Sequence, residues 1–159
     1  VVPGILELAE RPEQFRLALS LHAPTSELRS GLIPLEKRHP LPEVLSALKS
    51  FNRSGGKRIT FEYTMIRGVN DAPELIAPLA QLALSVEAYV NLIPFNPIPH
   101  QKWGPSEQHK IKNFAKSLQR HGVPTAIRET RGRDIDAACG QLRAQGIVEL
   151  TKPRNYSKN

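Results

Sequence analysis

One cysteine, Cys139, is the residue of this 159-residue chain best suited to nucleophilic chemistry. A lone thiol has no disulfide partner in the chain and cannot build a metal site by itself. Two interpretations of Cys139 stay open. It is a nucleophile if the neighbouring Arg131 and Arg133 favour its thiolate in the space left by small residues. It is a core thiol if it packs with the apolar residues that share its helical spacing, namely Ile135, Ala138 and Leu142.

Polar side chains at the ends of expected strands are the second set of candidates. Ser20 and His22 end the apolar run 17–22, and Asn91 and Asn96 lie in and after a later apolar run. Open α/β sheets and α/β barrels bind ligands at the carboxyl ends of their strands. The two-residue period of a strand places Ser20 and His22 on one face, where they can meet a ligand. The alternatives are that His22 only caps its strand and that the asparagines only form turns.

Alternating strand and helix patterns must position these residues. Runs rich in β-branched and aromatic residues predict four strands, at 17–22, 59–66, 88–95 and 124–130. The first run is apolar enough for a strand that is covered on both faces. Apolar positions at helical spacing predict four helices, at 3–10, 41–54, 71–85 and 106–121. A fifth, short helix is expected to reach about residue 144. The spacing is that of βα units, so we expect an α/β fold with a parallel sheet.

Three local features are also expected. Asp71 and Glu74 resemble a capping box that starts a helix, and Pro78 should kink that helix. The loop 23–40 has room for one helical turn. Glu62, in the second strand, is expected to be ion-paired or to face the sheet edge, with a functional role as the alternative.

The charge of the chain favours an anionic partner. Its 22 Lys and Arg residues against 15 Asp and Glu residues give a net charge of +7 and a pI of about 9.9. The excess is concentrated in residues 100–121, where Glu107 is the one acid, and in the tail beyond residue 151. Such patches suit phosphate backbones, although a solvated helix face is the alternative. With three Tyr, five Phe and one Trp, a base-stacking platform is not evident.

Composition and missing motifs exclude several classes of protein. Hydrophobic residues make up 40% of the chain, which is enough for a folded core. No run of about 18 apolar residues predicts a membrane span, and no signal-peptide pattern is present. One cysteine fits a reducing compartment, so we expect the cytoplasm. The sequence has no Walker motif, no Gly-x-Gly-x-x-Gly after a strand, no zinc or iron cysteine spacing and no nucleophile elbow.

Three ordered blocks resemble one enzyme family. They are Ser20-Leu21-His22-Ala23-Pro24, then Asn91-Leu92-Ile93-Pro94-Phe95-Asn96-Pro97, and then residues 130–142 around Cys139. These blocks are similar to the RlmN and Cfr family, and the similarity covers about residues 1–145. Members of this family are radical SAM methyltransferases that act on an adenine of 23S rRNA. RlmN-type enzymes, the better match, methylate C2 and also act on certain tRNAs, whereas Cfr-type enzymes methylate C8.

The resemblance implies a fold, a mechanism and a set of site residues. The fold would be the C-terminal half of a partial (β/α) radical SAM barrel. Cys139 would receive a methyl group from one S-adenosyl-L-methionine (SAM) molecule, and a second SAM, cleaved at a [4Fe-4S] cluster, would give the radical that activates it. A second, upstream cysteine would release the product by forming a disulfide. The residues implied to bind SAM are Ser20, Leu21, His22 and Asn96.

The departures from the family pattern also matter. The chain has no Cys-x-x-x-Cys-x-x-Cys cluster motif, no upstream resolving cysteine, no Gly-Glu SAM motif and no RNA-binding accessory domain. One thiol cannot hold a cluster that needs three cysteine ligands. We therefore interpret residues 1–145 as a fragment of the enzyme core that is inactive alone, and residues 146–159 as a basic, disordered tail. The alternatives are a stand-alone basic RNA-binding module and a fragment of a C8 methyltransferase.

Overall fold

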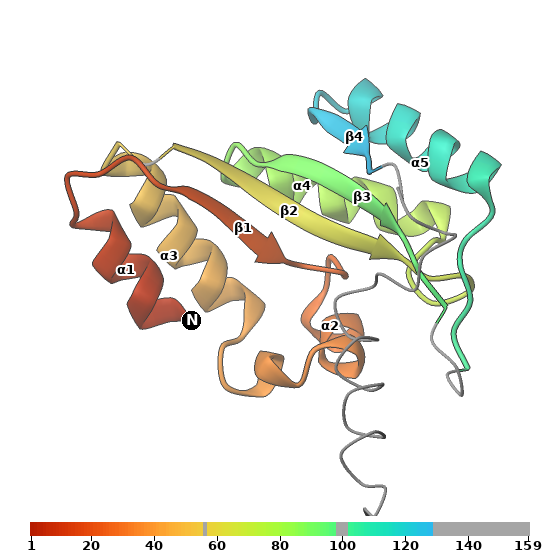
Figure 1. Cartoon of the computed structure of the whole chain (residues 1–159), viewed down its shortest axis with the longest axis horizontal. Coiled ribbons are helices and arrows are strands. Elements are labelled where there is room, and N and C mark those ends of the chain that lie inside the picture. The colour runs from red at the N-terminus through yellow and green to blue at the C-terminus, as the bar shows by residue number, and fades with distance from the viewer. Residues whose placement is uncertain (56, 98–101, 129–159) are drawn as a thin grey trace, which may run out of the picture.

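The computed structural model describes residues 1–55, 57–97 and 102–128. Four strands in this part of the chain form one parallel sheet in the order β1-β2-β3-β4 (Figure 1). The strands are β1 (Arg16–Ser20), β2 (Lys57–Met65), β3 (Tyr89–Pro94) and β4 (Thr125–Ile127). The expected α/β fold with about four strands is therefore confirmed. The block around Cys139, the expected helix up to residue 144 and the tail 146–159 lie outside the described residues.

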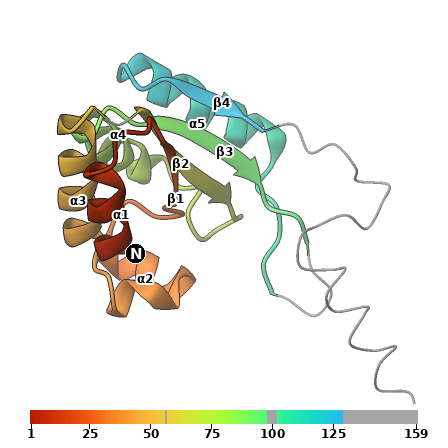
Figure 2. The same ribbon diagram turned by 60° about the vertical axis from the view of Figure 1, so that its left-hand side comes forward.

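Helices connect the strands and cover one face of the sheet. The α-helices are α1 (Val2–Ala9), α2 (Ser26–Leu32), α3 (Leu41–Arg53), α4 (Ile76–Ser85) and α5 (Gln108–Arg120), and short 3-10 helices lie at Pro34–Lys37 and Pro73–Leu75. Figures 1 and 2 show α1, α3, α4 and α5 on the same side of the sheet. The helical turn expected between β1 and α3 is present and longer than expected, because it comprises α2 and the first 3-10 helix. Strand, helix and parallel strand in this order form the βα unit that the sequence predicted.

The two faces of the sheet differ because successive side chains of a strand point to opposite faces. Four alternate residues of β2 are buried in the core against the helices: Ile59, Phe61, Tyr63 and Met65. In the described part of the chain no helix covers the other face, and Arg16, Ala18 and Ser20 of β1 are exposed. The expectation that the first strand is covered on both faces is therefore wrong.

Helix α4 starts later than expected because Asp71 belongs to the loop before it. The Asp71 carboxylate accepts a hydrogen bond from the N–H of Gly68, at 2.8 Å, and not from the helix. The capping box expected from Asp71 and Glu74 is therefore wrong. Pro78 lies in the first turn of α4, where N–H groups have no partner within the helix. The proline is thus compatible with an unbroken helix, and the structure does not require the expected kink.

The helix side of the sheet forms one apolar core. Its fully buried residues include Leu79 of α4 and Leu118 of α5. Tyr63 of β2 stacks on Phe114 of α5, with ring centroids 5.8 Å apart. The apolar stripes predicted for α3 and α5 are therefore confirmed as parts of the core. No helix in the described ranges is long and apolar enough to cross a membrane.

Two leucines of α4 offer a matched test of this core. Leu79 is fully buried (0% exposed), whereas Leu84 is 50% exposed. We expect Leu79→Ala to lower the free energy of unfolding by about 2–5 kcal/mol, because it removes buried methyl groups and leaves a cavity. We expect Leu84→Ala to change this free energy by no more than about 0.5 kcal/mol. Urea titrations followed by circular dichroism measure both values, and equal losses would contradict the core described above.

Candidate functional site

A row of polar side chains crosses the uncovered face of the sheet. The register aligns Ser20 of β1 with Glu62 of β2, and Glu62 with Asn91 of β3. Residues aligned in this way on neighbouring parallel strands point to the same face. The Asn91 amide Nδ2 donates to the Glu62 carboxylate, at 3.0 Å to Oε2 and 3.3 Å to Oε1. The expected ion-paired or edge position of Glu62 is wrong, because β2 is an inner strand and no cation pairs with Glu62 among the described residues.

The chain leaves β1 by a backbone turn at His22. The N–H groups of Leu21 and His22 both donate to the carbonyl of Glu62, at 3.0 and 3.3 Å. His22 has a φ of 55°, a left-handed conformation that strand residues do not adopt. The alternation expected from Ser20 to His22 therefore stops at Ser20, where β1 ends. The spacing argument for a shared face of these two side chains does not hold.

The His22 imidazole closes the carboxyl edge between β1 and β2. Its Nδ1 accepts a hydrogen bond from the N–H of Thr64 at 3.0 Å. A ring nitrogen that accepts carries no proton, so this imidazole is neutral and has its proton on Nε2. Burial, and then the positive charge of Arg29, lower the pKa of His22. Nδ1 therefore has the capping role, while the Nε2–H has no acceptor among the described residues and is left for a ligand.

Asn70, in the loop after β2, is fully buried (0% exposed) and uses its whole amide. Its Nδ2 donates to the carbonyls of His22, at 2.8 Å, and Thr64, at 2.7 Å. Its Oδ1 accepts from the N–H of Ile66 at 2.7 Å, and its backbone carbonyl accepts from the Tyr63 hydroxyl at 2.8 Å. Sequence reasoning missed this residue. Its one sequence signal is an amide in the exit loop that follows a predicted strand.

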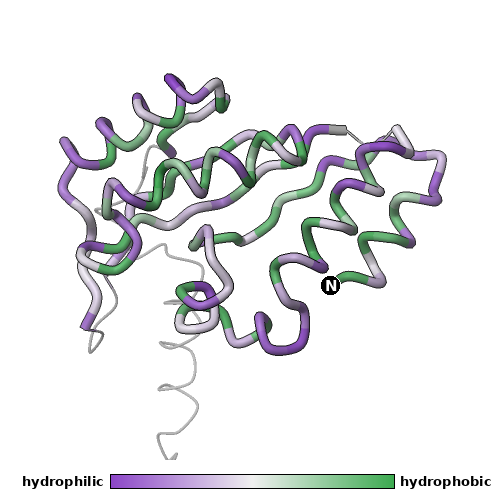
Figure 3. Tube along the Cα trace, turned by 180° about the vertical axis from the view of Figure 1, so that it is seen from behind, coloured by the Kyte–Doolittle hydropathy of each residue, from purple (hydrophilic) through white to green (hydrophobic). Residues whose placement is uncertain are grey.

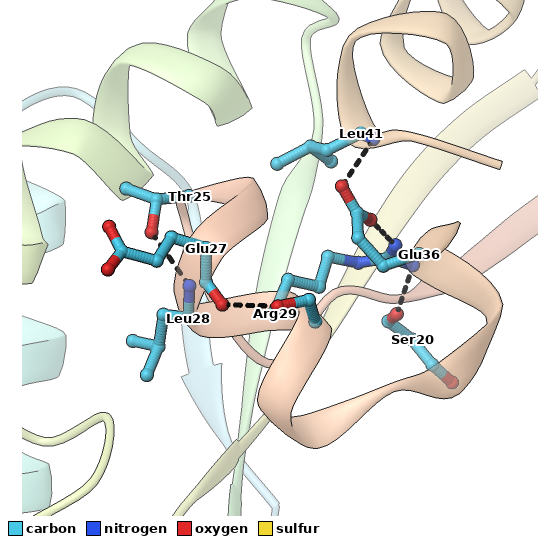
Figure 4. A network of polar contacts seen from close by, with 8 residues as sticks. Ser20, Thr25, Glu27, Leu28, Arg29, Glu36 and Leu41 are labelled. Atoms are coloured by element: carbon cyan, nitrogen blue, oxygen red, sulfur yellow. Dashed lines mark hydrogen bonds and ion pairs between the residues drawn. The ribbon is translucent and has the colours of Figure 1, made fainter. Parts of the chain in front are cut away.

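A buried ion pair fixes α2 against the end of β1 (Figure 4). Arg29 pairs with Glu36, and both side chains are 5% exposed. Arg29 Nη2 also donates to the carbonyl of Ser20 at 3.3 Å, and Glu36 accepts from the N–H of Leu41 at 2.9 Å. Burial alone would raise the pKa of Glu36, but hydrogen bonds from Ser26, Leu41 and Arg29, together with the Arg29 charge, lower this pKa overall. The pair joins β1, α2 and the start of α3, a link that no sequence pattern revealed.

The structure places all four residues expected to bind SAM at the carboxyl edge of the sheet. Ser20, Leu21 and His22 lie where β1 ends, and Asn96 follows the end of β3. The side chains of Ser20 and Asn96 are exposed. Leu21 is fully buried, so it can offer only backbone groups to a ligand. Cys139 lies outside the described residues.

The described residues contain no group of three or more His, Cys, Asp or Glu side chains that could hold a metal ion. The whole chain has one cysteine. A [4Fe-4S] cluster of the expected kind needs three thiolates. The residues of this chain therefore do not fit the cluster that the resemblance implies.

Solved structures share this arrangement of strands and helices. A crystal structure of a radical SAM methyltransferase from Sphaerobacter thermophilus matches with a TM-score of 0.84 and 44% identity, over 89% of this chain and 41% of that chain. A domain of pyruvate-formate lyase-activating enzyme from Bacteroides vulgatus matches with a TM-score of 0.60 and 16% identity, over 80% and 74% of the two chains, and supports the fold alone. No family model matches the sequence. The fold is that of the radical SAM class.

Sequence relatives narrow this class to one family. A probable dual-specificity RNA methyltransferase RlmN of Gemmatimonas aurantiaca is 52% identical over 147 residues, which are 92% of this chain and 40% of the relative. Proteins of the same description from Geobacillus thermodenitrificans and Geobacillus kaustophilus are each 41% identical over 152 residues, 96% of this chain and 42% of each relative. The chain belongs to the RlmN-type radical SAM methyltransferases. It spans about two fifths of the length of the curated relatives it matches.

Asn70 gives a test of how the carboxyl edge is held. We expect Asn70→Ala to lower the free energy of unfolding by about 3 kcal/mol, because it leaves the N–H of Ile66 and the carbonyls of His22 and Thr64 without partners. Asn113→Ala, at an exposed position of α5, is the control, with an expected change within about 0.5 kcal/mol. Denaturant unfolding measures both variants. A loss no larger than that of the control would contradict the role of the Asn70 amide.

The pH dependence of stability gives a test of the His22 bond. Because the pKa of His22 is lowered by folding, the unfolded chain binds this proton more readily than the folded chain. The stability is therefore highest, with respect to this group, above the unfolded pKa of 6.5, and it falls as the pH drops below that value towards the folded pKa. His22→Asn keeps an acceptor atom and tolerates the positive φ. We expect this variant to lack the part of the acid-induced loss of stability that His22 causes.

Unfolding free energies of three proteins between about pH 5 and pH 8 measure this effect. They are the unchanged chain, His22→Asn and the control His109→Asn, which alters an exposed histidine of α5. We expect the control to keep the loss at low pH. The same pH profile in His22→Asn as in the unchanged chain would contradict the neutral, Nδ1-accepting state of His22.

Proposed function

We propose that this chain is part of an RNA methyltransferase that methylates C2 of an adenine in 23S rRNA, with Cys139 as the methyl carrier. The observation that carries the proposal is the match of almost the whole chain to probable dual-specificity RNA methyltransferases RlmN. Their description as dual-specificity RNA methyltransferases supports a second RNA substrate, and the resemblance implies that it is tRNA. We place the enzyme in the cytoplasm, in line with the single cysteine of the chain.

The carboxyl edge of the sheet has groups that suit SAM, which supplies the methyl group when bound. SAM carries an amino group, a carboxylate and ribose hydroxyls, all of which form hydrogen bonds. The exposed Ser20 hydroxyl, the His22 Nε2–H and the exposed Asn96 amide can each donate to the carboxylate or to the hydroxyl oxygens. We assign SAM binding to these three side chains and to the backbone of Leu21. Buried hydrogen bonds from Arg29 and Asn70 hold the end of β1, which carries Ser20, Leu21 and His22.

Cys139 has the chemistry of a methyl carrier. A thiolate is a nucleophile that forms a sulfur–carbon bond with an activated methyl group, while the electron pair of the broken bond leaves with the methyl donor. Arg131 and Arg133 precede Cys139 by eight and six residues in the sequence, and either would favour the thiolate form if it lies beside the sulfur. The chain holds neither a second cysteine nor the cluster ligands. We therefore expect Cys139 to act only together with residues that this chain does not contain.

Two alternatives rest on specific observations. The three motif blocks resemble the RlmN and Cfr family as a whole, so methylation at C8 is the alternative reaction. The net charge of +7 and the cations of α5 favour a stand-alone RNA-binding module as the alternative function. The position of the methyl group separates the first alternative from the proposal, and methyl transfer itself separates the second.

A full-length chimera tests the proposed function. In it, this chain replaces the matching part of the Gemmatimonas aurantiaca relative, which supplies the other residues. We expect the chimera to form C2-methylated adenosine in 23S rRNA. We expect Cys139→Ala to abolish this product and to keep SAM binding, because the substitution removes the thiol alone. Mass spectrometry of digested rRNA measures the product, and equilibrium dialysis measures SAM binding.

Ala137→Gly is the matched control for Cys139→Ala, because it alters a small neighbour and keeps the thiol. We expect this control to retain methylation. A product methylated at C8 would contradict the C2 assignment, and methylation by the Cys139→Ala chimera would contradict the carrier role. The stand-alone module would be favoured if the 159-residue chain binds RNA while the unchanged chimera does not methylate it.

A further inference from the structure

Helix α5 has four exposed Lys and Arg residues, and three of them form a row along one side. Lys112, Lys116 and Arg120 are each four residues apart, so they lie along one side of the helix. All three are exposed and lie outside the buried stripe of α5. Figure 3 shows this division, with hydrophilic residues on the outer turns of α5 and apolar residues towards the sheet. We call these three residues the α5 ridge.

Helix stability does not explain the α5 ridge. Like charges four residues apart on a helix repel each other. Arg120 lies in the last turn, where the helix dipole favours a cation, but Lys112 and Lys116 lie outside that turn and gain nothing from the dipole. No acid pairs with the ridge in the described part of the chain, whose ion pairs are Glu7–Arg11, Arg29–Glu36 and Glu107–His109.

The α5 ridge has the length and chemistry of a contact with several phosphates. A step of four residues along an α-helix is about 6 Å, so the ridge spans about 12 Å. A nucleic-acid strand carries one phosphate for about every 3.4 Å of its helix axis. The one aromatic residue of α5, Phe114, is buried in the core. The ridge therefore offers positive charge to a backbone and no aromatic platform on which a base could stack.

The start of α5 lies beside the carboxyl edge of the sheet. Pro105, shortly before α5, forms a bridge with Ile66, which directly follows β2. The N–H of Arg67 donates to the carbonyl of Gly104 at 3.0 Å. The α5 ridge therefore runs from the edge that carries the candidate site along the outer side of the helix layer.

We propose that the α5 ridge binds the phosphate backbone of the RNA substrate outside the candidate site. The choice of RNA rests on the proposed function, whereas the place and the backbone character of the contact rest on α5 itself. Phosphate contacts position a nucleic acid and carry no direct sequence information. The ridge therefore raises the affinity for RNA of any sequence.

Two triple variants of the 159-residue chain test this proposal. In the ridge variant, glutamine replaces Lys112, Lys116 and Arg120. The control variant removes the same charge from exposed positions on the first 3-10 helix and α3. In it, glutamine replaces Lys37, Lys49 and Arg53. Fluorescence anisotropy measures the binding of two fluorescein-labelled RNA hairpins of different sequence, in KCl from about 50 to 200 mM.

We expect the ridge variant to lose about tenfold or more in affinity for both hairpins at low salt. The slope of log Kobs against log salt concentration should fall in magnitude by about three, one for each lost phosphate contact. We expect the control variant to keep the slope of the unchanged chain. Lys116→Gln alone should lower the slope by about one, which keeps the test valid if the triple variant is unstable.

Equal slopes in the ridge and control variants would overturn the proposal. A loss confined to one hairpin sequence would overturn the backbone character of the contact, and no saturable binding by the unchanged chain at about 50 mM KCl would overturn the proposal as a whole. None of these results decides the proposed function, whose test is product formation by the chimera. Conversely, ridge-dependent RNA binding with an inactive chimera would overturn the proposed function alone.

Discussion

The side-chain amide of Asn70 is the interaction on which the candidate site depends. It binds backbone groups of three segments, which are His22 after β1, Thr64 at the end of β2 and Ile66 in the loop that follows. Buried N–H and C=O groups need partners, and the sheet no longer supplies them once β1 ends at Ser20. One amide can satisfy all three groups because it has both donor and acceptor atoms. The left-handed turn at His22, and with it the Nδ1 bond to Thr64, is therefore held from the neighbouring loop.

A charged pair supports the same strand end from the other side. The carbonyl of Ser20 accepts from Arg29, and the carbonyl of His22 accepts from Asn70, so one side chain from α2 and one from the loop after β2 fix the end of β1. A buried ion pair adds little net stability, because both charges lose their hydration, but loss of one partner leaves an uncompensated charge. The ion pair therefore matters more for the position of the strand end than for the stability of the fold. The same Arg29 charge lowers the pKa of His22, so Arg29 also helps to keep the imidazole neutral at the candidate site.

Periodic patterns predicted the fold, whereas contacts between distant residues lay beyond them. The buried stripe of α5 and the alternation of β2 are properties of single segments, so residue spacing is enough to predict them. The bonds of His22 to Thr64 and to Asn70 join residues 42 and 48 positions apart, and no local pattern encodes them. Asp71 shows the same limit, because its position fits a helix cap while its carboxylate binds the N–H of Gly68. The predicted site residues came from polar positions at strand ends and from the motif blocks, and neither indicates that the amide of Asn70 supports them.

The helix layer separates two polar surfaces with different electrostatic requirements. The open face of the sheet carries Glu62 and Asn91, and the edge beside it carries a neutral His22. The α5 ridge lies on the far side of a helix about 10 Å in diameter. Burial and the charge of Arg29 account for the lowered pKa of His22, and no cation of the ridge is among the causes. Positive charge on α5 can therefore attract a polyanion without shifting the protonation of His22, which responds to burial and to Arg29. Cations placed on the open face would attract a polyanion and also shift the protonation of His22.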